Sequence, residues 1–302
     1  MYDIIIIGAG PAGLTAAIYG RRANKKVLVL EALTYGGQIA NTTVIDNYPA
    51  LPHVSGFDFA TNLYNQVIEL GAEVKFERVI NINVDNEKKV ITDSGEYTGR
   101  AIIIATGSDR RKLGLENEDR FTGSGISYCA TCDGNFFKDK EVAVNGGGNT
   151  ALTDALYLAD ICSKVYLIHR RDEFRGNEVL VDAIRKRDNI ELILNSRVTK
   201  LNGDNHLTSI TVTNNDGSEK ELAVNCLFVA IGQVPVTENF VKLIDVDDNG
   251  YAIAGEDMKT RIPGVYVAGD VRKKTLRQLA TAINDGAIAA TQAIFDINNK
   301  VI

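Results

Sequence analysis

The sequence predicts an α/β protein made of two Rossmann-like dinucleotide-binding domains of the three-layer ββα type, with the second domain inserted in the first. Three observations support this. The glycine fingerprint of a dinucleotide-binding βαβ unit occurs twice, the two units have equal length, and a last buried strand has no counterpart in the second half. A chain of 302 residues is too long for one compact core and suits about two domains.

The first fingerprint opens the chain. The apolar run DIIII leads into GAGPAG at 8–13, and helix-favouring residues follow over 14–23. A second apolar strand, KVLVL, ends at Leu30. In such a unit the first glycine permits a tight turn, the second lets the backbone approach a pyrophosphate, and the third lets helix and strand pack closely. We therefore expect a pyrophosphate at the N-terminus of this helix.

The same pattern returns in the second half. The run EVAVN leads into GGGNTA at 146–151, a helix is expected over 152–159, and the strand KVYLI ends at Ile168. In both units the residue after the second strand lies 23 positions beyond the first glycine; it is Glu31 in one and His169 in the other. A lone fingerprint is a weak signal, but two fingerprints between a strand and a helix are a strong one.

The remaining segments complete two similar halves. Each half closes on a buried strand that ends in a glycine turn, and β-type runs precede that strand. The closing strands are 100–108 and 226–232, and the β-type runs are 73–84 with 89–92 and 191–200 with 208–212. A strand at 264–270 and a helix over about 275–295 end the chain. This topology predicts residues 1–112 and 245–302 as the first domain and 113–244 as the second.

The residue after the second strand contacts the ribose in this fold, and it differs between the units. Glu31 accepts hydrogen bonds from the 2′ and 3′ hydroxyls and repels a 2′-phosphate. The run His169-Arg170-Arg171, with Arg175 one helical turn beyond, offers guanidinium groups that suit a 2′-phosphate. A solvated basic run is the ordinary alternative. We predict a dinucleotide without a 2′-phosphate in the first domain and NADPH in the second.

A C-x-x-C pair, Cys129 and Cys132, precedes the second fingerprint. A zinc site usually needs a second pair, and Cys162 and Cys226 are isolated in apolar segments where we expect core residues. The spacing tends to lower the pKa of one thiol, so a redox dithiol is favoured over a chance surface pair, and no metal is expected. Asp133 follows directly and either carries protons in thiol–disulfide exchange or caps a turn.

Two dinucleotide sites and one redox dithiol indicate an electron relay. NADPH delivers a hydride, whereas a disulfide is a poor hydride acceptor. A flavin between them accepts the hydride and passes electrons to sulfur. FAD is therefore the expected occupant of the first domain.

Composition excludes several other classes of protein. A net charge of −6 argues against nucleic acid or an anionic membrane as the main partner. No apolar run reaches the roughly 18 residues typical of a membrane span. The start of the sequence lacks the basic region and cleavage site of a signal peptide, so a reducing cytoplasm is the predicted compartment.

Over essentially its whole length the chain resembles the bacterial low-molecular-weight thioredoxin reductases. The matching segments, in the order usual for that family, are GAGPAG (8–13), GGQ (36–38), NYP (47–49), ATG (105–107), CATCDG (129–134), GGGNTA (146–151), HRRDEFR (169–175), IGQVP (231–235), AGDV (268–271) and RQ (277–278). CATCD beside GGGNTA and HRRxxxR is highly specific. The chain departs from the family pattern at Ala50, Asn145 and Thr153, where glycine, an aliphatic residue and an acidic residue are usual.

The resemblance implies a role for each motif. Cys132 exchanges electrons with the flavin, Cys129 attacks the disulfide of thioredoxin, and Asp133 is the acid/base. The residues implied to hold FAD are Gly8, Gly10, Pro11, Ala12, Gly13, Glu31, Ala32, Gly36, Gly37, Gln38, Asn47, Ala105, Thr106, Gly107, Gly269, Asp270, Arg277, Gln278 and Leu279. Those implied to hold NADPH are Gly146, Gly148, Asn149, Thr150, His169, Arg170, Arg171 and Arg175.

The resemblance further implies a homodimer that reduces thioredoxin or a thioredoxin-like protein. Its NADPH domain would rotate between one arrangement that brings nicotinamide to the flavin and another that frees the dithiol. Two other functions stay open. One is a flavin-dependent thioredoxin reductase that takes electrons from ferredoxin, and the other is a non-catalytic flavin redox sensor. Turnover of a disulfide substrate separates the sensor from the enzymes.

Overall fold

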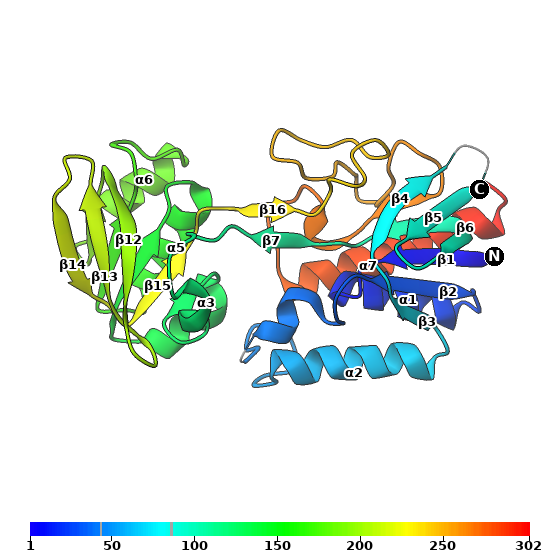
Figure 1. Cartoon of the computed structure of the whole chain (residues 1–302), viewed down its shortest axis with the longest axis horizontal. Coiled ribbons are helices and arrows are strands. Elements are labelled where there is room, and N and C mark those ends of the chain that lie inside the picture. The colour runs from blue at the N-terminus through cyan, green and yellow to red at the C-terminus, as the bar shows by residue number, and fades with distance from the viewer. Residues whose placement is uncertain (43, 85–86) are drawn as a thin grey trace. The chain divides into compact units, whose positions relative to one another are not determined.

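The structure is a computed structural model that describes residues 1–42, 44–84 and 87–302. The chain forms two compact units (Figure 1). Unit 1 comprises Met1–Asp109 and Val234–Ile302, and unit 2 comprises Arg110–Gln233, so unit 2 is an insertion in unit 1. The two crossings form β7 (Ser108–Arg110) and β16 (Gln233–Pro235), which pair with each other. The second crossing precedes the predicted boundary near residue 244, because Phe240 and Ile244 are buried in the core of unit 1.

Unit 1 contains a sheet whose central strands are parallel. Strand β1 lies between β2 and β6, and β17 pairs with the carboxyl half of β6. The amino half of β6 pairs antiparallel with β5, which pairs with β4. The strands are β1 (Tyr2–Ile7), β2 (Val27–Glu31), β3 (Glu73–Phe76), β4 (Val79–Asn83), β5 (Lys88–Thr92), β6 (Glu96–Ile104) and β17 (Val265–Val267).

Both faces of the central strand β1 are buried. Ile4 and Ile6 pack on the side of α1 (Pro11–Arg22) and α7 (Leu279–Asn298), whereas Ile5 and Ile7 pack toward β4 and β5 on the other side. Successive side chains of a strand point to opposite faces, so a strand covered on both faces is an unbroken apolar run. Helix α2 (Gly56–Glu69) and the short helices η1 (Gly37–Asn41) and η3 (Gly269–Val271) complete the unit.

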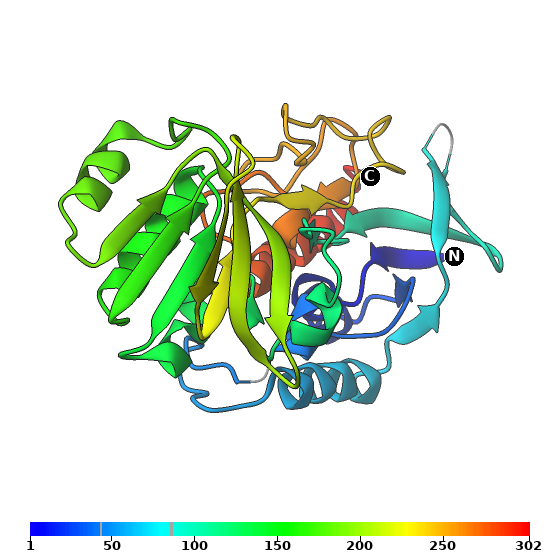
Figure 2. The same cartoon turned by 60° about the vertical axis from the view of Figure 1, so that its left-hand side comes forward.

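Unit 2 has the same three layers (Figure 2). Its parallel sheet has the order β11-β10-β9-β15-β8; helices α5 and α6 cover one face and an antiparallel sheet, β12-β13-β14, covers the other. The elements are α3 (Glu118–Phe121), β8 (Ile126–Ser127), α4 (Ala130–Asp133), η2 (Gly134–Phe137), β9 (Glu141–Asn145), α5 (Asn149–Ala159), β10 (Lys164–Ile168), α6 (Glu178–Arg185), β11 (Ile190–Ile193), β12 (Ser196–Gly203), β13 (Leu207–Asn214), β14 (Glu219–Ala223) and β15 (Cys226–Val229). The predicted fold class is confirmed.

Several element boundaries differ from the sequence prediction. Helices α2 and α6 and strand β14 were not predicted, and α1 and α5 begin three residues early, directly after the glycine turn. The last helix begins at Leu279 and not near residue 275, because Gln278 and Thr281 form a capping box there. Among the described residues, no helix is both long and apolar enough to cross a membrane.

Two glycines allow α1 to pack closely against its neighbours. A Cβ at Gly13 would lie 1.9 Å from the Gly8 carbonyl oxygen, where the helix meets the fingerprint loop. A Cβ at Gly286 of α7 would lie 2.1 Å from the Ala12 carbonyl oxygen. Both distances are to backbone atoms, which cannot rotate away. The position of α7 therefore depends on the absence of a side chain at Gly286.

We predict that Gly286→Ala destabilises unit 1, because the added methyl group must move α7 away from α1. The expected loss in the free energy of unfolding is about 1–3 kcal/mol, as for other overpacked cores. Denaturant unfolding of the variant and the parent measures it. Gly95→Ala is the matched control, since its Cβ would lie 3.4 Å from the nearest atom, the Tyr97 hydroxyl oxygen. Equal stability of both variants would contradict the packing argument.

Candidate functional site

The predicted site residues of unit 1 gather at one edge of its sheet. The strands β2, β1, β6 and β17 run parallel, so their carboxyl ends meet at the same edge. The fingerprint follows β1, Glu31 ends β2, Ala105–Gly107 follow β6 and Gly269 follows β17. Ligands of open parallel sheets bind at this edge, where neighbouring connections leave in opposite directions.

The fingerprint loop presents backbone in front of a helix N-terminus. Gly8 has φ +104°, and a Cβ there would lie 2.4 Å from the Ala105 carbonyl oxygen. Gly10 is the N-cap of α1 and makes no side-chain capping bond; Pro11 follows as the first helical residue. A Cβ at Gly10 would meet no atom within 4 Å. This open space beside an uncapped helix N-terminus fits a pyrophosphate.

Glu31 and the segment after it form one wall of this space. The two carboxylate oxygens of Glu31 accept from the Ala9 amide at 2.8 Å and the Leu33 amide at 2.9 Å. Each oxygen keeps a lone pair for a ribose hydroxyl. The Gly36 amide donates to the Ala9 carbonyl at 2.8 Å, which brings the GGQ segment against the fingerprint. Ala32, Gly37 and Gln38 are exposed.

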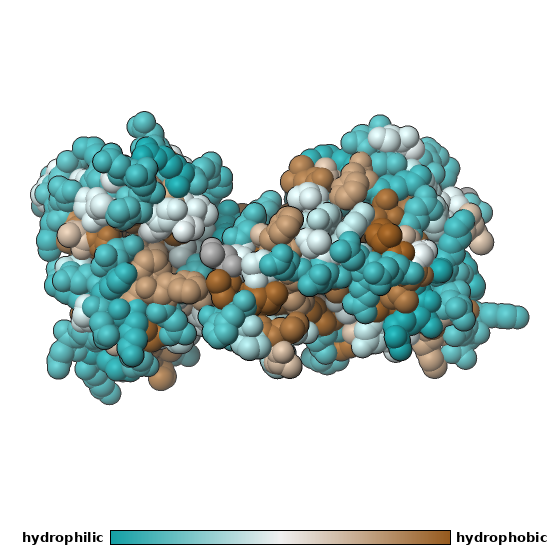
Figure 3. Space-filling model, turned by 90° about the horizontal axis from the view of Figure 1, so that it is seen from below, coloured by the Kyte–Doolittle hydropathy of each residue, from teal (hydrophilic) through white to brown (hydrophobic). Residues whose placement is uncertain are grey.

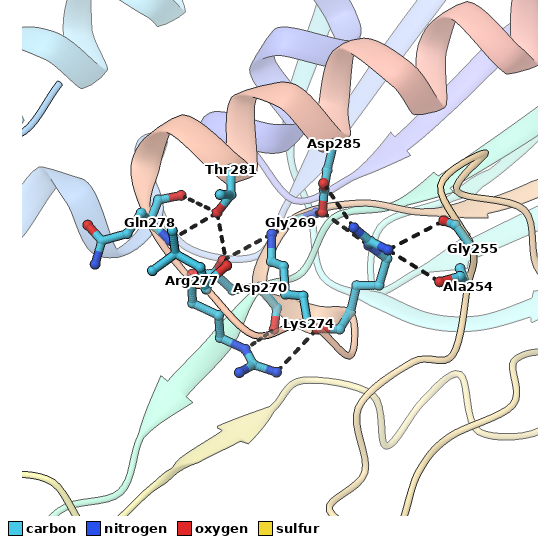
Figure 4. A network of polar contacts seen from close by, with 11 residues as sticks. Ala254, Gly255, Gly269, Asp270, Lys274, Arg277, Gln278, Thr281 and Asp285 are labelled. Carbon is cyan, nitrogen blue, oxygen red and sulfur yellow. Dashed lines mark hydrogen bonds and ion pairs between the residues drawn. The ribbon is translucent and has the colours of Figure 1, made fainter. Parts of the chain in front are cut away.

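The opposite wall is a polar network around η3 (Figure 4). Asp285 of α7 is buried and accepts from the Gly269 amide at 3.1 Å, from the Arg272 guanidinium at 3.2 Å and from the Lys274 ammonium at 3.0 Å. Arg277 donates to the carbonyl oxygens of Asp270 and Arg272 at 3.3 and 3.2 Å. Asp285 was not predicted from the sequence, because nothing in the local sequence signals a buried ion cluster.

Asp270 is the incompletely paired member of this region. Its Oδ1 atom is buried without a hydrogen-bond partner, and the Lys274 ammonium lies 3.7 Å away. Burial raises the pKa of the Asp270 carboxyl group, and the nearby Lys274 and Arg277 cations oppose that shift. A buried acceptor oxygen without a donor fits a ligand that brings a hydroxyl group to it.

The remaining predicted residues of unit 1 lie around the start of α7 and the end of β6. The Asn47 side-chain amide donates to Gln278 Oε1 at 2.9 Å, and Leu279 is the buried first residue of α7. The Thr106 hydroxyl donates to the Val236 carbonyl at 2.7 Å. Ala50, a departure from the family pattern, has φ 67°, a conformation that favours glycine.

The second fingerprint repeats this geometry in unit 2. A Cβ at Gly146 would lie 2.4 Å from the Ala230 carbonyl oxygen, the same distance as from a Cβ at Gly8 to the Ala105 carbonyl oxygen. Gly148 is the N-cap of α5 without a side-chain capping bond, and a Cβ there would meet nothing within 4 Å. The Asn149 side chain accepts from the Asn177 amide at 2.7 Å, and Thr150 is exposed. This site also fits a pyrophosphate.

The side chain of His169 packs against the second fingerprint loop. A Cβ at Gly147 would lie 2.2 Å from the His169 ring, and the ring stacks on Phe174 with a centroid distance of 5.5 Å. Burial lowers the pKa of His169, and the positive charges of Arg170, Arg171 and Arg175 lower it further. The three arginines are exposed beside this loop, and the Arg175 amide donates to the Gly147 carbonyl at 2.8 Å. A neutral packed imidazole is therefore surrounded by cationic groups.

Cys129 and Cys132 form a disulfide directly after β8, which ends at the carboxyl edge of the sheet of unit 2. Asp133 ends the short helix α4 and accepts from the Ser127 hydroxyl at 2.6 Å. Cys162 and Cys226 are buried free thiols, as predicted, and burial raises the pKa of Cys162 to about 11. The described residues contain no His, Cys, Asp or Glu cluster able to hold a metal ion.

Comparison with known proteins relates this geometry to characterised relatives. Residues 2–286 match the family model described as pyridine nucleotide-disulphide oxidoreductase. The thioredoxin reductases of Listeria monocytogenes and Mycoplasma genitalium are 42% and 40% identical to the chain; they align with 97% and 98% of it and with 93% and 96% of their own lengths. The crystal structure of thioredoxin reductase from Streptococcus pyogenes has a TM-score of 0.93 at 38% identity, over 99% of both chains. The resemblance indicated by the motifs is confirmed.

Asp154 is an acidic residue of α5 that the sequence analysis did not single out. It follows Thr153, where the family pattern is acidic; Thr153 is exposed, whereas Asp154 is partly buried. Burial raises the pKa of Asp154 to about 6. Above that pH the folded protein holds a carboxylate in a poorly solvated place.

We predict that Asp154→Asn stabilises the protein at pH 7.5 by about 1–2 kcal/mol. Between about pH 4 and 6 the folded parent holds a proton that the unfolded chain has lost, so its free energy of unfolding falls as pH rises. The free energy of unfolding of Asp154→Asn does not fall in this way, and it equals that of the parent near pH 4. Denaturant unfolding across pH 4–8 measures the difference. The exposed Asp182→Asn is the control, and parallel curves for Asp154→Asn and the parent would refute the assignment.

Proposed function

This chain belongs to the pyridine nucleotide-disulphide oxidoreductase family as an oxidoreductase of the thioredoxin reductase type, and we propose that it reduces a thioredoxin disulfide with electrons from NADPH. Unit 1 is the FAD-binding domain, and unit 2 is the NADPH-binding domain that carries the redox disulfide. The observation that carries this proposal is the pairing of two dinucleotide cradles, one acidic and one basic, with the Cys129–Cys132 disulfide.

The residues of unit 1 suit FAD. The open space at Gly10 admits the pyrophosphate, and Glu31 accepts from the adenosine ribose. The buried acceptor Oδ1 of Asp270 suits a hydroxyl group of the ligand, and Gln278 holds Asn47 at the start of α7. When bound, FAD supplies two-electron chemistry between a nicotinamide and a disulfide.

The residues of unit 2 suit NADPH. The N-terminus of α5 at Gly148 binds the pyrophosphate, and Arg170, Arg171 and Arg175 bind the 2′-phosphate. His169 packs against Gly147, and its buried Nε2 atom, which has no hydrogen-bond partner in the described part of the chain, suits contact with the bound nucleotide.

The reduced dithiol then exchanges with thioredoxin, and protons balance within the exchange. Asp133 takes the proton of Cys129; the Cys129 thiolate attacks the thioredoxin disulfide, and one S–S bond breaks as another forms. The departing thiolate takes the proton from Asp133. Cys132 loses its own proton in the same way and attacks the Cys129 sulfur, which restores the Cys129–Cys132 disulfide and releases the second thiol of thioredoxin.

A homodimer in the cytoplasm completes the proposal. Figure 3 views unit 1 from the side of α2 and shows apolar side chains exposed among polar ones. On α2 itself, Phe57 and Ile68 are exposed large apolar residues. An exposed apolar surface is suited to contact with a second chain.

The deciding experiment is anaerobic. We expect the purified flavoprotein to lose its oxidised-flavin absorbance on addition of NADPH, with NADH far slower, and then to reduce thioredoxin over many turnovers. A Cys132→Ser variant is expected to stay reducible by NADPH and to lose thioredoxin reduction. Thioredoxin reduction by that variant would refute the relay. Turnover with reduced ferredoxin but not NADPH would favour the ferredoxin-dependent alternative, and reduction without turnover would favour a sensor.

We predict that replacing Arg170 and Arg171 with alanine weakens NADPH binding about 10- to 100-fold, because charge-assisted hydrogen bonds to the 2′-phosphate are lost. Binding of NADH, which lacks that phosphate, stays nearly unchanged. Titration calorimetry with both nucleotides measures the two effects. Arg185→Ala, an exposed arginine of α6, is the control. Equal losses for NADPH and NADH would show that the arginines do not select the phosphate.

A further inference from the structure

The hydroxyl group of Ser127 lies between the backbone of Cys129 and the carboxyl group of Asp133. Ser127 is the last residue of β8, is buried, and pairs with Phe228 of β15. Its position is therefore fixed by the sheet of unit 2 and not by the loop that carries the disulfide. Neither the motifs nor the family resemblance singled out this residue.

The Ser127 hydroxyl has more possible contacts than protons. It donates to Asp133 Oδ2 at 2.6 Å and accepts from the Cys129 amide at 3.1 Å. The Cys129 carbonyl oxygen lies 3.4 Å away as a second acceptor. A hydroxyl group carries one proton and two lone pairs, so it can donate to only one of the two oxygens at a time. The shorter bond to a carboxylate is the stronger one.

This hydroxyl can serve both protonation states of Asp133. When Asp133 is a carboxylate, Ser127 donates to Oδ2. When Asp133 is protonated, its own hydroxyl donates to Ser127 Oγ, and the Ser127 proton can turn to the Cys129 carbonyl. The Cys129 amide donates to Ser127 Oγ in both states. An acid/base must pass between these states twice in each exchange cycle.

Two charged or titratable groups of other elements also influence Asp133. The Arg110 guanidinium is partly buried, lies 5.2 Å from the centroid of the Tyr128 ring and is attracted by Asp133. The Tyr128 hydroxyl donates to Glu118 at 2.7 Å, which holds that ring in place. The Cys226 thiol of β15 lies near Asp133 as well, but burial raises its pKa well above its usual value, so it stays neutral. Of these groups, Ser127 is the one that can form a hydrogen bond with either protonation state of Asp133.

We propose that Ser127 is a positioning residue for thiol–disulfide exchange, which holds the Asp133 carboxyl group against the backbone of Cys129 whether or not it carries a proton. The inference rests on the proposed function, in which Asp133 accepts and returns the protons of the dithiol. The hydrogen bonds of the Ser127 hydroxyl run to Asp133 and to the backbone of Cys129, so it acts through those groups and not on the sulfur atoms.

The test compares Ser127→Ala, Ser127→Thr and Ser196→Ala. Ser196 is equally buried in unit 2 and donates to the Leu194 carbonyl, so its variant reports the cost of losing a buried hydroxyl elsewhere. The protein is first reduced with dithiothreitol. The first readout is the rate at which iodoacetamide alkylates Cys129, measured by mass spectrometry as a function of pH. This readout needs neither NADPH nor thioredoxin. The second readout is kcat and KM for thioredoxin across the same pH range.

We expect Ser127→Ala to move the acid limb of the alkylation profile up by about one pH unit, because the carboxylate has lost a donor and protonates more readily. We expect kcat to fall about tenfold at pH 7, with KM for thioredoxin nearly unchanged. Ser127→Thr restores the parent profile, and Ser196→Ala leaves it in place. In an Asp133→Asn background, Ser127→Ala produces no further shift.

An alkylation profile of Ser127→Ala that superimposes on the parent would overturn the inference, as would an equal shift in Ser196→Ala. A parent protein that fails to turn over thioredoxin would instead contradict the proposed function, while the alkylation profiles would still decide the role of Ser127. Thermal unfolding of each variant identifies a fold defect. If Ser127→Ala does not fold, a shifted profile in folded Ser127→Thr, which keeps the hydroxyl group, would overturn the inference.

Discussion

Both dinucleotide sites depend on one constraint, the close approach of a helix to the loop that precedes it. In unit 1, α1 can begin directly after β1 only because Gly13 has no side chain to meet the Gly8 carbonyl. In unit 2 the corresponding position is Ala151, whose Cβ lies only 2.7 Å from where a Gly146 Cβ would be. Helix α7 also packs closely against α1, because Gly286 has no side chain. This packing sets where Gln278 and Asn47 lie. Ligand geometry in this protein therefore follows from backbone packing.

The sequence predicted the parts of the structure that repeat with a period, and it missed those that depend on tertiary contacts. The strands before each fingerprint, the glycine turns and the buried cysteines were predicted, because β-branched runs and glycine spacing are local signals. The second crossing was placed too late, since only packing in three dimensions reveals that Phe240 belongs to the core of unit 1. The start of α7 was placed too early, because the capping box at Gln278 depends on a side-chain contact with Thr281. The bond between Ser127 and Asp133 was not predicted, since six positions separate the two residues across an irregular turn.

Three carboxyl groups show how differently the same side chain is used. Asp285 has four donors and stabilises the loop around η3. Asp270, the residue directly after Gly269, keeps one buried oxygen without a donor. Asp133 has a hydroxyl partner, that of Ser127, which can either donate or accept. A carboxylate whose oxygens all have donors, such as Asp285, is typical of a structural role. A buried oxygen without a donor, as in Asp270, is typical of a ligand site. A partner that can donate or accept, as at Asp133, suits proton transfer.

The insertion of unit 2 also constrains the order in which the chain folds. Strand β17 and helix α7, which complete the sheet and helical layer of unit 1, follow the insert in sequence. During synthesis the first part of unit 1 therefore emerges without its last strand and helix, whereas unit 2 emerges whole. The ends of unit 2 meet at the Arg111 amide and Gly232 carbonyl, 3.1 Å apart, so its folding brings the two parts of unit 1 together. If unit 2 were a flexible loop of the same number of residues, bringing its two ends together would cost on the order of 4 kcal/mol of chain entropy. When unit 2 has already folded, its ends are together before α7 leaves the ribosome.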